Sequence, residues 1–148
     1  MTGKEIISQL PYSAPFLFVD ELEVIDENGI TGNYTFKPTE FFYQGHFKNL
    51  PITPGVILTE TMAQIGLVCL GIYLLKDELN GTEKTVMAFT SMEVEFLIPV
   101  LPGEKVRVTS QKKYFRFGKL KCAVEMKNCK NELVCNGTLS GIIKMNNE

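Results

Sequence analysis

Three residues in the first half of the chain have the types and spacing of a small acid/base site: His46, Gly55 and Glu60. His46 is the only histidine, and an imidazole accepts or releases a proton near neutral pH without extreme tuning. Glu60 is the single charged residue in an apolar run that begins near Gly55. Burial in such a run should raise the pKa of the Glu60 carboxyl and make a proton-donating form accessible.

Thr53-Pro54-Gly55 predicts a helix start, with Thr53 as the N-cap and Pro54 at the first helical position. The first turn of a helix has backbone N–H groups without intrahelical partners, at the positive end of the dipole. Because Gly55 has no side chain, the N–H groups of Gly55 and Val56 form a candidate cradle for a carbonyl oxygen that gains negative charge. A base, an acid and this cradle are what removal of water from a β-hydroxy carbonyl compound needs.

Each of these residues also has a plainer interpretation. His46 can be a surface or structural histidine, and Gly55 can belong to a well-capped helix and nothing more. Glu60 can be exposed, or it can hydrogen bond to Gln64, one turn further along the same helix face. Other chemistries have little support, because the sequence contains no Gly-rich phosphate loop, serine elbow or metal-ligand cluster.

A long helix should position Gly55 and Glu60. It is predicted from Thr53 to about Leu79, where Asn80-Gly81 ends it, and apolar residues nearly all round it indicate that protein surrounds it. Its length raises the question of a membrane span, but Glu60 and three polar neighbours in its first half favour a buried helix of a soluble protein.

The remaining segments predict an antiparallel sheet. A short helix is expected to open at Thr2-Gly3-Lys4-Glu5 and to stop before Pro11. Strands are expected over 16–25 and 30–36, joined by a hairpin at Asn28-Gly29, and then over 84–89 leading into 92–98, 104–117, 119–127 and 132–145. The fold class predicted for residues 1–148 is therefore one α+β domain in which an antiparallel sheet wraps around the long helix.

Composition and charge indicate the cellular compartment and the kinds of partner to expect. The four cysteines show no metal-type spacing, so free thiols are expected, and no secretion signal opens the chain, which favours the cytoplasm. Residues 104–130 contain nine basic and two acidic residues. This stretch either attracts an acidic partner or consists of the solvated faces of two strands. We expect no nucleic-acid partner.

The motifs around His46 and Glu60 resemble the signature of the 3-hydroxyacyl-[acyl-carrier-protein] dehydratases of bacterial fatty-acid synthesis. The matching segments are Gly45-His46-Phe47, Pro51-Ile52-Thr53-Pro54-Gly55-Val56 and Glu60-Thr61-Met62-Ala63-Gln64. The likeness extends upstream to 15–20 and downstream to 94–104, and thus covers most of the chain in the right order. The separation of fourteen residues from His46 to Glu60 also fits.

The resemblance implies a hotdog fold and a homodimer, or a trimer of dimers, in which His46 of one chain and Glu60 of the other share a site. It implies that His46 is the catalytic base and Glu60 the acid. The substrate-binding residues it implies are Gly55, Val56, Gln64 and Phe47. The substrate would be tethered to acyl carrier protein, an acidic partner, with Arg116 and Lys119 as the first candidates for docking. No cofactor and no metal are implied.

The chain departs from the family pattern at Pro11-Tyr12-Ser13-Ala14, at Phe96-Leu97-Ile98 and at Lys48-Asn49. These departures leave the proposed chemistry intact, but they favour a specialised lipid or polyene pathway over housekeeping synthesis. Two rival functions are a hotdog thioesterase, which would release a free thiol, and a non-catalytic subunit that binds acyl carrier protein. The sequence does not give the acyl-chain length or the preference between carrier protein and CoA.

Overall fold

The chain opens with a short helix, as predicted. The computed structural model describes residues 1–78 and 83–147, and in it helix α1 spans Gly3–Ser8. The hydroxyl of Thr2 caps this helix by accepting a hydrogen bond of 3.2 Å from the backbone N–H of Glu5. Ile6, on its inner face, is fully buried.

A β-hairpin follows, and the predicted Asn-Gly turn is confirmed. Strand β1 spans Glu21–Asp26 and strand β2 spans Gly29–Thr35. The Asp26 carboxylate closes the turn by accepting from the backbone N–H groups of Asn28, at 2.7 Å, and Gly29, at 3.0 Å. The prediction that the first strand starts at residue 16 is wrong, because Phe16 and Phe18 bond to the Gln64 side chain instead of to a neighbouring strand.

The central helix is buried almost all round, as predicted, but it is not regular. It consists of α2, Gly55–Ala63, a π-helical segment η2, Gln64–Cys69, and α3, Leu70–Leu74. In the middle of the π-helical segment the buried Ser110 hydroxyl donates a hydrogen bond of 2.9 Å to the carbonyl of Gly66. The helix is long and apolar enough to cross a membrane, but 83% of its most apolar window is buried in the fold, as in a core helix.

Two predicted helix boundaries need correction. The helix begins at Gly55 with Pro54 in the N-cap position, one residue later than predicted. The Thr53 hydroxyl lies 2.6 Å from the Tyr43 hydroxyl, so it is engaged there and makes no capping bond. At the other end the helix stops at Leu74, and the predicted terminator Asn80-Gly81 lies outside the described residues.

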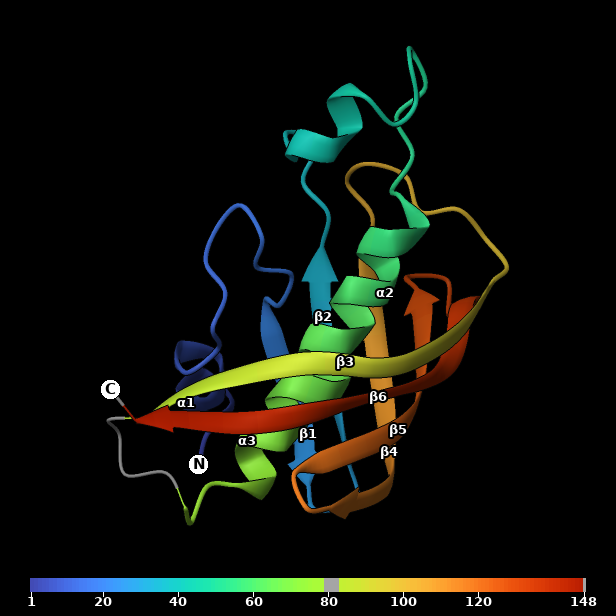
Figure 1. Cartoon of the computed structure of the whole chain (residues 1–148). Helices are drawn as coiled ribbons and strands as arrows, with labels where there is room; N and C mark the ends of the chain where they lie inside the picture. The colour runs from blue at the N-terminus through green and yellow to red at the C-terminus, as the bar shows by residue number, and fades with distance from the viewer. Residues whose placement is uncertain (79–82, 148) are drawn as a thin grey trace.

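The described residues form one sheet of six antiparallel strands in the order β1-β2-β4-β5-β6-β3. The last four strands are β3 (Glu83–Phe96), β4 (Lys105–Arg116), β5 (Lys119–Asn128) and β6 (Leu133–Asn147). The two stretches predicted over 84–98 form the single strand β3, with a bulge between Phe89 and Ser91. Figure 1 shows the sheet curled around the central helix, with β3 and β6 in front of it and β2 and β4 behind. The predicted α+β fold is confirmed.

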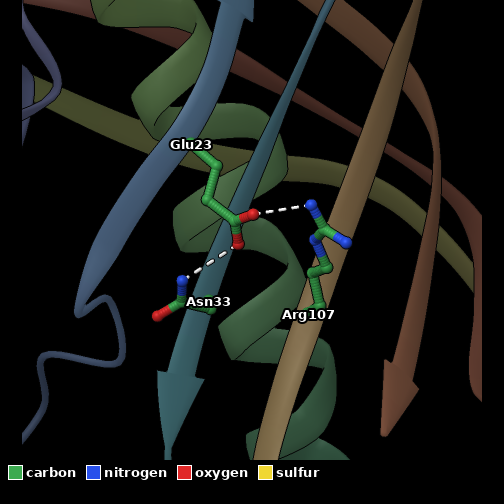
Figure 2. A network of polar contacts seen from close by, with 3 residues as sticks. All are labelled: Glu23, Asn33 and Arg107. Atoms are coloured by element: carbon green, nitrogen blue, oxygen red, sulfur yellow. Dashed lines mark hydrogen bonds and ion pairs between the residues drawn. The ribbon is translucent and has the colours of Figure 1, made fainter. Parts of the chain in front are cut away.

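The predicted alternation along the strands is also confirmed. On β5 the side chains of Leu120, Cys122, Val124 and Met126 face the helix and are buried, while Lys121, Ala123 and Glu125 between them lie on the outer face. The basic stretch of residues 104–130 therefore consists mainly of the solvated faces of β4 and β5. At least one of its cations has a structural role, as Figure 2 shows: the Glu23 carboxylate on β1 accepts from Asn33 on β2, at 2.9 Å, and from Arg107 on β4, at 2.6 Å.

Candidate active site

His46 lies in the loop between a 3₁₀ helix, η1 (Phe41–Gln44), and the start of α2. Its backbone carbonyl accepts a hydrogen bond of 2.9 Å from the N–H of Ile52, and its ring Nδ1 lies 2.8 Å from the carbonyl oxygen of Ile52. A carbonyl oxygen accepts only, so Nδ1 must carry the proton and donate it. This contact fixes the tautomer and leaves the lone pair of Nε2 free to take a proton.

The Phe47 ring stacks on the His46 imidazole, with 3.8 Å between ring centroids and 30° between planes, across a cis peptide bond. The imidazole is partly exposed, and about half of the Phe47 side chain is open to solvent. The ring of His46 is therefore held on one side by Ile52 and on one face by Phe47.

The first turn of α2 offers the N–H groups predicted for an oxyanion cradle. The N–H groups of Ile57 and Leu58 already bond to the carbonyl of Pro54, at 2.9 and 3.1 Å. The N–H groups of Gly55 and Val56 come before them and have no acceptor in the described part of the chain. The Val56 side chain is 76% exposed, so this turn lies at the surface of the chain.

Phe96, near the end of β3, borders the same helix start. A Cβ atom added to Gly55 would lie 3.2 Å from two atoms of the Phe96 ring, which is closer than ordinary van der Waals contact. The absence of a side chain at Gly55 thus admits the ring of Phe96 beside the cradle. Nothing in the local pattern around Phe96 predicts this contact.

Glu60 is half-buried and accepts a hydrogen bond of 3.0 Å at Oε2 from Nε2 of Gln64. Burial raises the pKa of the Glu60 carboxyl above its ordinary value, and the bond from Gln64 partly opposes this rise. The predicted pairing of Glu60 with Gln64 is thus present. A raised pKa makes the protonated carboxyl more accessible near neutral pH.

Gln64 is fully buried and uses its whole amide group. Besides the bond to Glu60, its Nε2 donates to the carbonyl of Phe16 at 3.1 Å, and its Oε1 accepts from the N–H of Phe18 at 2.8 Å. The amide orientation is therefore fixed by the backbone of the segment before β1. This segment thereby determines where Glu60 points.

Tyr12 is a further residue of this region that sequence reasoning missed. It is partly buried against the core, and its ring centroid lies 6.4 Å from that of Phe16. Burial and then the negative charge of Glu60 raise the pKa of the Tyr12 phenol, so the hydroxyl is a neutral donor. Tyr12 lies in Pro11-Tyr12-Ser13-Ala14, where the sequence departs from the family pattern. This departure is the one feature of the sequence that could have drawn attention to Tyr12.

The structure forms two separate clusters from the predicted residues. Within residues 1–78 and 83–147 no hydrogen bond joins His46 to Glu60: the first is held by Ile52 and the second by Gln64. The predicted docking residues Arg116 and Lys119 flank the β4–β5 turn, which Figure 1 places at the opposite end of the sheet from the loop that carries His46. A prominent hollow, lined by Thr109, Gln111, Glu125 and Thr138, lies on the outer face of the sheet, away from both clusters.

All four cysteines are free thiols, as predicted, and only Cys129 is exposed. Among the described residues no group of three His, Cys, Asp or Glu side chains is arranged to hold a metal ion.

Known proteins match this chain along nearly its whole length. Residues 10–138 match the family model of the FabA-like domain. A 3-hydroxyacyl-[acyl-carrier-protein] dehydratase FabZ of Clostridium perfringens is 34% identical over 143 residues, which cover 94% of this chain and 96% of the relative. The FabZ of Ehrlichia canis is 33% identical over 149 residues, covering 97% of this chain and 95% of that protein.

Solved structures agree on the fold. The dehydratase heterocomplex ApeI:P from Xenorhabdus doucetiae superimposes with a TM-score of 0.75 at 14% identity, covering 92% of this chain and 89% of that one. A hypothetical thioesterase from Streptococcus pneumoniae, solved with coenzyme A, has a TM-score of 0.61 at 10% identity and covers 98% of both chains.

A sheet wrapped around one central helix is the hotdog fold, and the FabZ relatives make the chain an enzyme of the hydro-lyase class. The chain belongs to the FabA-like family, as its motifs indicated.

Proposed function

We propose that this enzyme dehydrates (3R)-3-hydroxyacyl groups carried by acyl carrier protein to trans-2-enoyl groups, in fatty-acid or a related lipid or polyene biosynthesis. The names of the relatives support the substrate, because they are 3-hydroxyacyl-[acyl-carrier-protein] dehydratases that match almost the whole chain. The observation that carries the mechanism is the bond between His46 Nδ1 and the Ile52 carbonyl, since it leaves Nε2 as a base.

In the proposed reaction the lone pair of His46 Nε2 takes the proton from C2 of the acyl chain. The electron pair of that C–H bond forms the C2–C3 double bond, and the C3–O bond breaks. Protonated Glu60 gives its proton to the leaving hydroxyl, which departs as water. Proton transfer from the imidazolium of His46 back to the carboxylate of Glu60, directly or through water, restores both groups.

Negative charge develops on the thioester oxygen as the C2 proton leaves. The N–H groups of Gly55 and Val56 would hold this oxygen, which is the type of contact that contributes roughly 10² to 10³ in rate. Gln64 keeps the Glu60 carboxyl oriented, and the exposed ring of Phe47 contacts the acyl chain next to the base.

The site requires a second copy of the chain in this proposal. Strand β3 ends the sheet, and an edge strand of fourteen residues invites pairing with another strand. Its exposed apolar side chains are Val86, Phe89, Met92 and Phe96, and such a group on an edge strand marks a protein contact. A homodimer formed along β3, alone or in a trimer of dimers, would bring His46 of one chain to Glu60 of the other.

The remaining proposals concern the setting of the enzyme. Residues 1–148 would form one catalytic domain that acts in the cytoplasm without a metal or cofactor. The acidic acyl carrier protein would dock on basic side chains of the outer face, with Arg116 and Lys119 as the predicted contacts.

A product assay tests the function. The purified protein is mixed with a 3-hydroxyacyl thioester, and enoyl absorbance and free thiol are followed together. Dehydration gives an enoyl thioester and no thiol. Thiol release that does not depend on the 3-hydroxyl would instead identify a thioesterase, and carrier binding without either product would identify a non-catalytic subunit.

A further inference from the structure

The loop that carries His46 is closed at its base by a buried hydrogen bond between two hydroxyl groups. The Tyr43 hydroxyl lies 2.6 Å from the hydroxyl of Thr53, ten residues further along the chain. Both residues are buried, and neither hydroxyl has a second hydrogen bond among the described residues. Because a buried hydroxyl without a partner is costly, each of these groups depends on the other. The bond therefore ties the two ends of the loop together.

Further hydrogen bonds inside the loop connect this base to the imidazole. The N–H of Ile52 donates to the backbone carbonyl of His46 at 2.9 Å, and the carbonyl of Ile52 accepts from Nδ1 of His46 at 2.8 Å. At the tip of the loop the backbones of Phe47 and Leu50 bond to each other in both directions, at 2.6 and 3.0 Å. The residue that holds the imidazole thus directly precedes Thr53.

Thr53 is fixed to the rest of the fold between the base and the helix start. Its N–H donates a hydrogen bond of 2.9 Å to the carbonyl of Val100, in the segment between β3 and β4. Ile52, the partner of the imidazole, lies on one side of Thr53, and Pro54, the N-cap of α2, lies on the other. The position of Thr53 therefore determines where the Ile52 carbonyl lies and where the first turn of α2 begins.

Tyr43 is also held in place, by a different element. Within η1 its N–H donates to the carbonyl of Glu40 at 3.2 Å, and its ring packs edge-on against Phe42, with 4.7 Å between ring centroids. Burial raises the pKa of the Tyr43 phenol, so the hydroxyl keeps its proton. Because each partner is anchored separately, the bond between Tyr43 and Thr53 sets the distance between η1 and the start of α2.

We propose that Tyr43 and Thr53 are positioning residues, whose mutual hydrogen bond holds the His46 imidazole in the tautomer and the place that a base requires. The inference rests on the proposed function, which makes His46 the base. Both residues act through the Ile52 carbonyl and not on the substrate itself. A displacement of roughly 1 Å at a reacting group can cost about 10² in rate, so a bond at the base of this loop is enough to affect kcat.

The polar character of this pair favours a geometric role over a purely stabilising one. Replacing both partners of a buried hydrogen bond by apolar groups of the same shape is often nearly neutral for stability. Apolar contacts, however, have no preferred direction. A hydrogen bond between two hydroxyl groups restricts both their distance and their angle. Tyr43 and Thr53 thus supply a directional restraint that an apolar pair of the same size lacks.

Four variants and one matched control test this role. Tyr43→Phe and Thr53→Val each remove one hydroxyl with little change in size, whereas Thr53→Ser keeps it. The double variant Tyr43→Phe/Thr53→Val leaves neither hydroxyl unpaired, so it keeps the test available where a single variant does not fold. Thr61→Val is the control, because Thr61 is also buried and donates a bond of 2.8 Å to the carbonyl of Ile57, outside the loop.

Nitrogen NMR reads the tautomer directly. His46 is the only histidine, so in protein labelled with ¹⁵N-histidine and freed of any tag the ring signals belong to it alone. The ring nitrogen shifts of the neutral imidazole show which nitrogen carries the proton. We expect the proton on Nδ1 in wild type, Thr53→Ser and Thr61→Val.

The other three variants should show a mixture of the two tautomers, because the Ile52 carbonyl is no longer held in place. An unchanged tautomer in these folded variants would overturn the proposal. A change of the same size in Thr61→Val would also overturn it, since it would reflect a general loss of stability.

Kinetics with a 3-hydroxyacyl pantetheine thioester give the second readout. Tyr43→Phe and Thr53→Val should each lower kcat about fivefold to tenfold and leave KM within about twofold of wild type. The double variant should be no slower than either single variant, because all three lack the same bond. Losses that multiply in the double variant, or an unchanged kcat beside a changed tautomer, would overturn the proposal. If wild type forms no enoyl product, the proposed function fails, and the tautomer measurement alone decides whether the pair positions His46.

Discussion

The Gln64 amide donates a hydrogen bond of 3.0 Å to Oε2 of Glu60 and is itself held by the backbone of Phe16 and Phe18. The acid of the proposed reaction is therefore oriented by a segment that is distant in sequence. Because this bond favours the charged carboxylate while burial disfavours it, Gln64 moderates the pKa of Glu60.

Replacing Gln64 should change the pH dependence of the reaction. The active form of Glu60 is protonated, so kcat falls as pH rises through the pKa of this carboxyl. Gln64→Met removes the bond that lowers this pKa, so the alkaline limb of the kcat profile should move to higher pH. We also expect kcat to fall, because the carboxyl loses its orientation.

Thr61→Val provides the control for this profile. Thr61 is buried on the same helix and donates a bond of 2.8 Å to the carbonyl of Ile57, but it has no hydrogen bond to Glu60. Its replacement should lower stability by about 1 kcal/mol and leave the limb in place. If the alkaline limb of the kcat profile moves equally in both variants, Gln64 does not set the pKa of Glu60.

Gly55→Ala should separate activity from stability. The added Cβ would lie 3.2 Å from the Phe96 ring, so the ring or the helix start must shift next to the cradle. Alanine is otherwise a good helix residue, and the melting temperature should stay level or rise. We expect kcat/KM to fall about tenfold or more. Adding Phe96→Leu to the Gly55→Ala protein should restore part of the lost kcat/KM. An unchanged rate in Gly55→Ala would show that the N–H groups of Gly55 and Val56 do not contribute to the reaction.

A mixing experiment tests whether the site is shared between two chains. His46→Ala and Glu60→Gln should each be inactive, but a mixed dimer contains one site with an intact His46 and an intact Glu60. Co-expression of the two chains should restore roughly a quarter of the wild-type rate, because about half of the dimers are mixed and each has one intact site. If the mixture stays as inactive as its parents, both residues act within one chain or not at all.

The ion pair between Glu23 and Arg107 should contribute to stability in a pH-dependent way. Hydrogen bonding from Asn33, together with Arg107, lowers the pKa of Glu23 below its ordinary value. The stabilisation is thus fully present above the unfolded pKa and is lost as pH falls through the lower folded value. In urea unfolding, Glu23→Gln should cost about 0.2 to 1 kcal/mol at pH 7. Below the lowered folded pKa of Glu23 the difference between the two proteins should shrink toward zero, and a cost that is constant with pH would contradict the assignment.

Some contacts of the candidate site follow from the sequence and others do not. His46 was singled out as the only histidine, Gly55 by its place at the helix start, and Glu60 and Gln64 as polar residues at helical spacing in an apolar run. The i,i+4 relation is enough to place Gln64 beside Glu60. By contrast, the bond from His46 to the Ile52 carbonyl involves a backbone acceptor, which has no sequence pattern.

The errors in the predicted elements have a common cause in long-range contacts. The segment from Phe16 to Asp20 is rich in β formers, but its backbone bonds to Gln64, so propensity alone overestimated the strand. The helix start moved by one residue because the Thr53 hydroxyl pairs with Tyr43. The π-helical segment contains Gly66, whose carbonyl accepts a hydrogen bond from Ser110 on β4. This long-range contact likewise has no local sequence pattern.

The rate of enoyl formation in wild type, His46→Ala and Glu60→Gln tests the central claim most directly. With a 3-hydroxyacyl thioester as substrate, the account predicts a rising enoyl absorbance for wild type. It predicts a loss of at least about a hundredfold in each variant, because each lacks one of the two proton-transfer groups. Equal rates in all three folded proteins would contradict the assignment of His46 as base and Glu60 as acid.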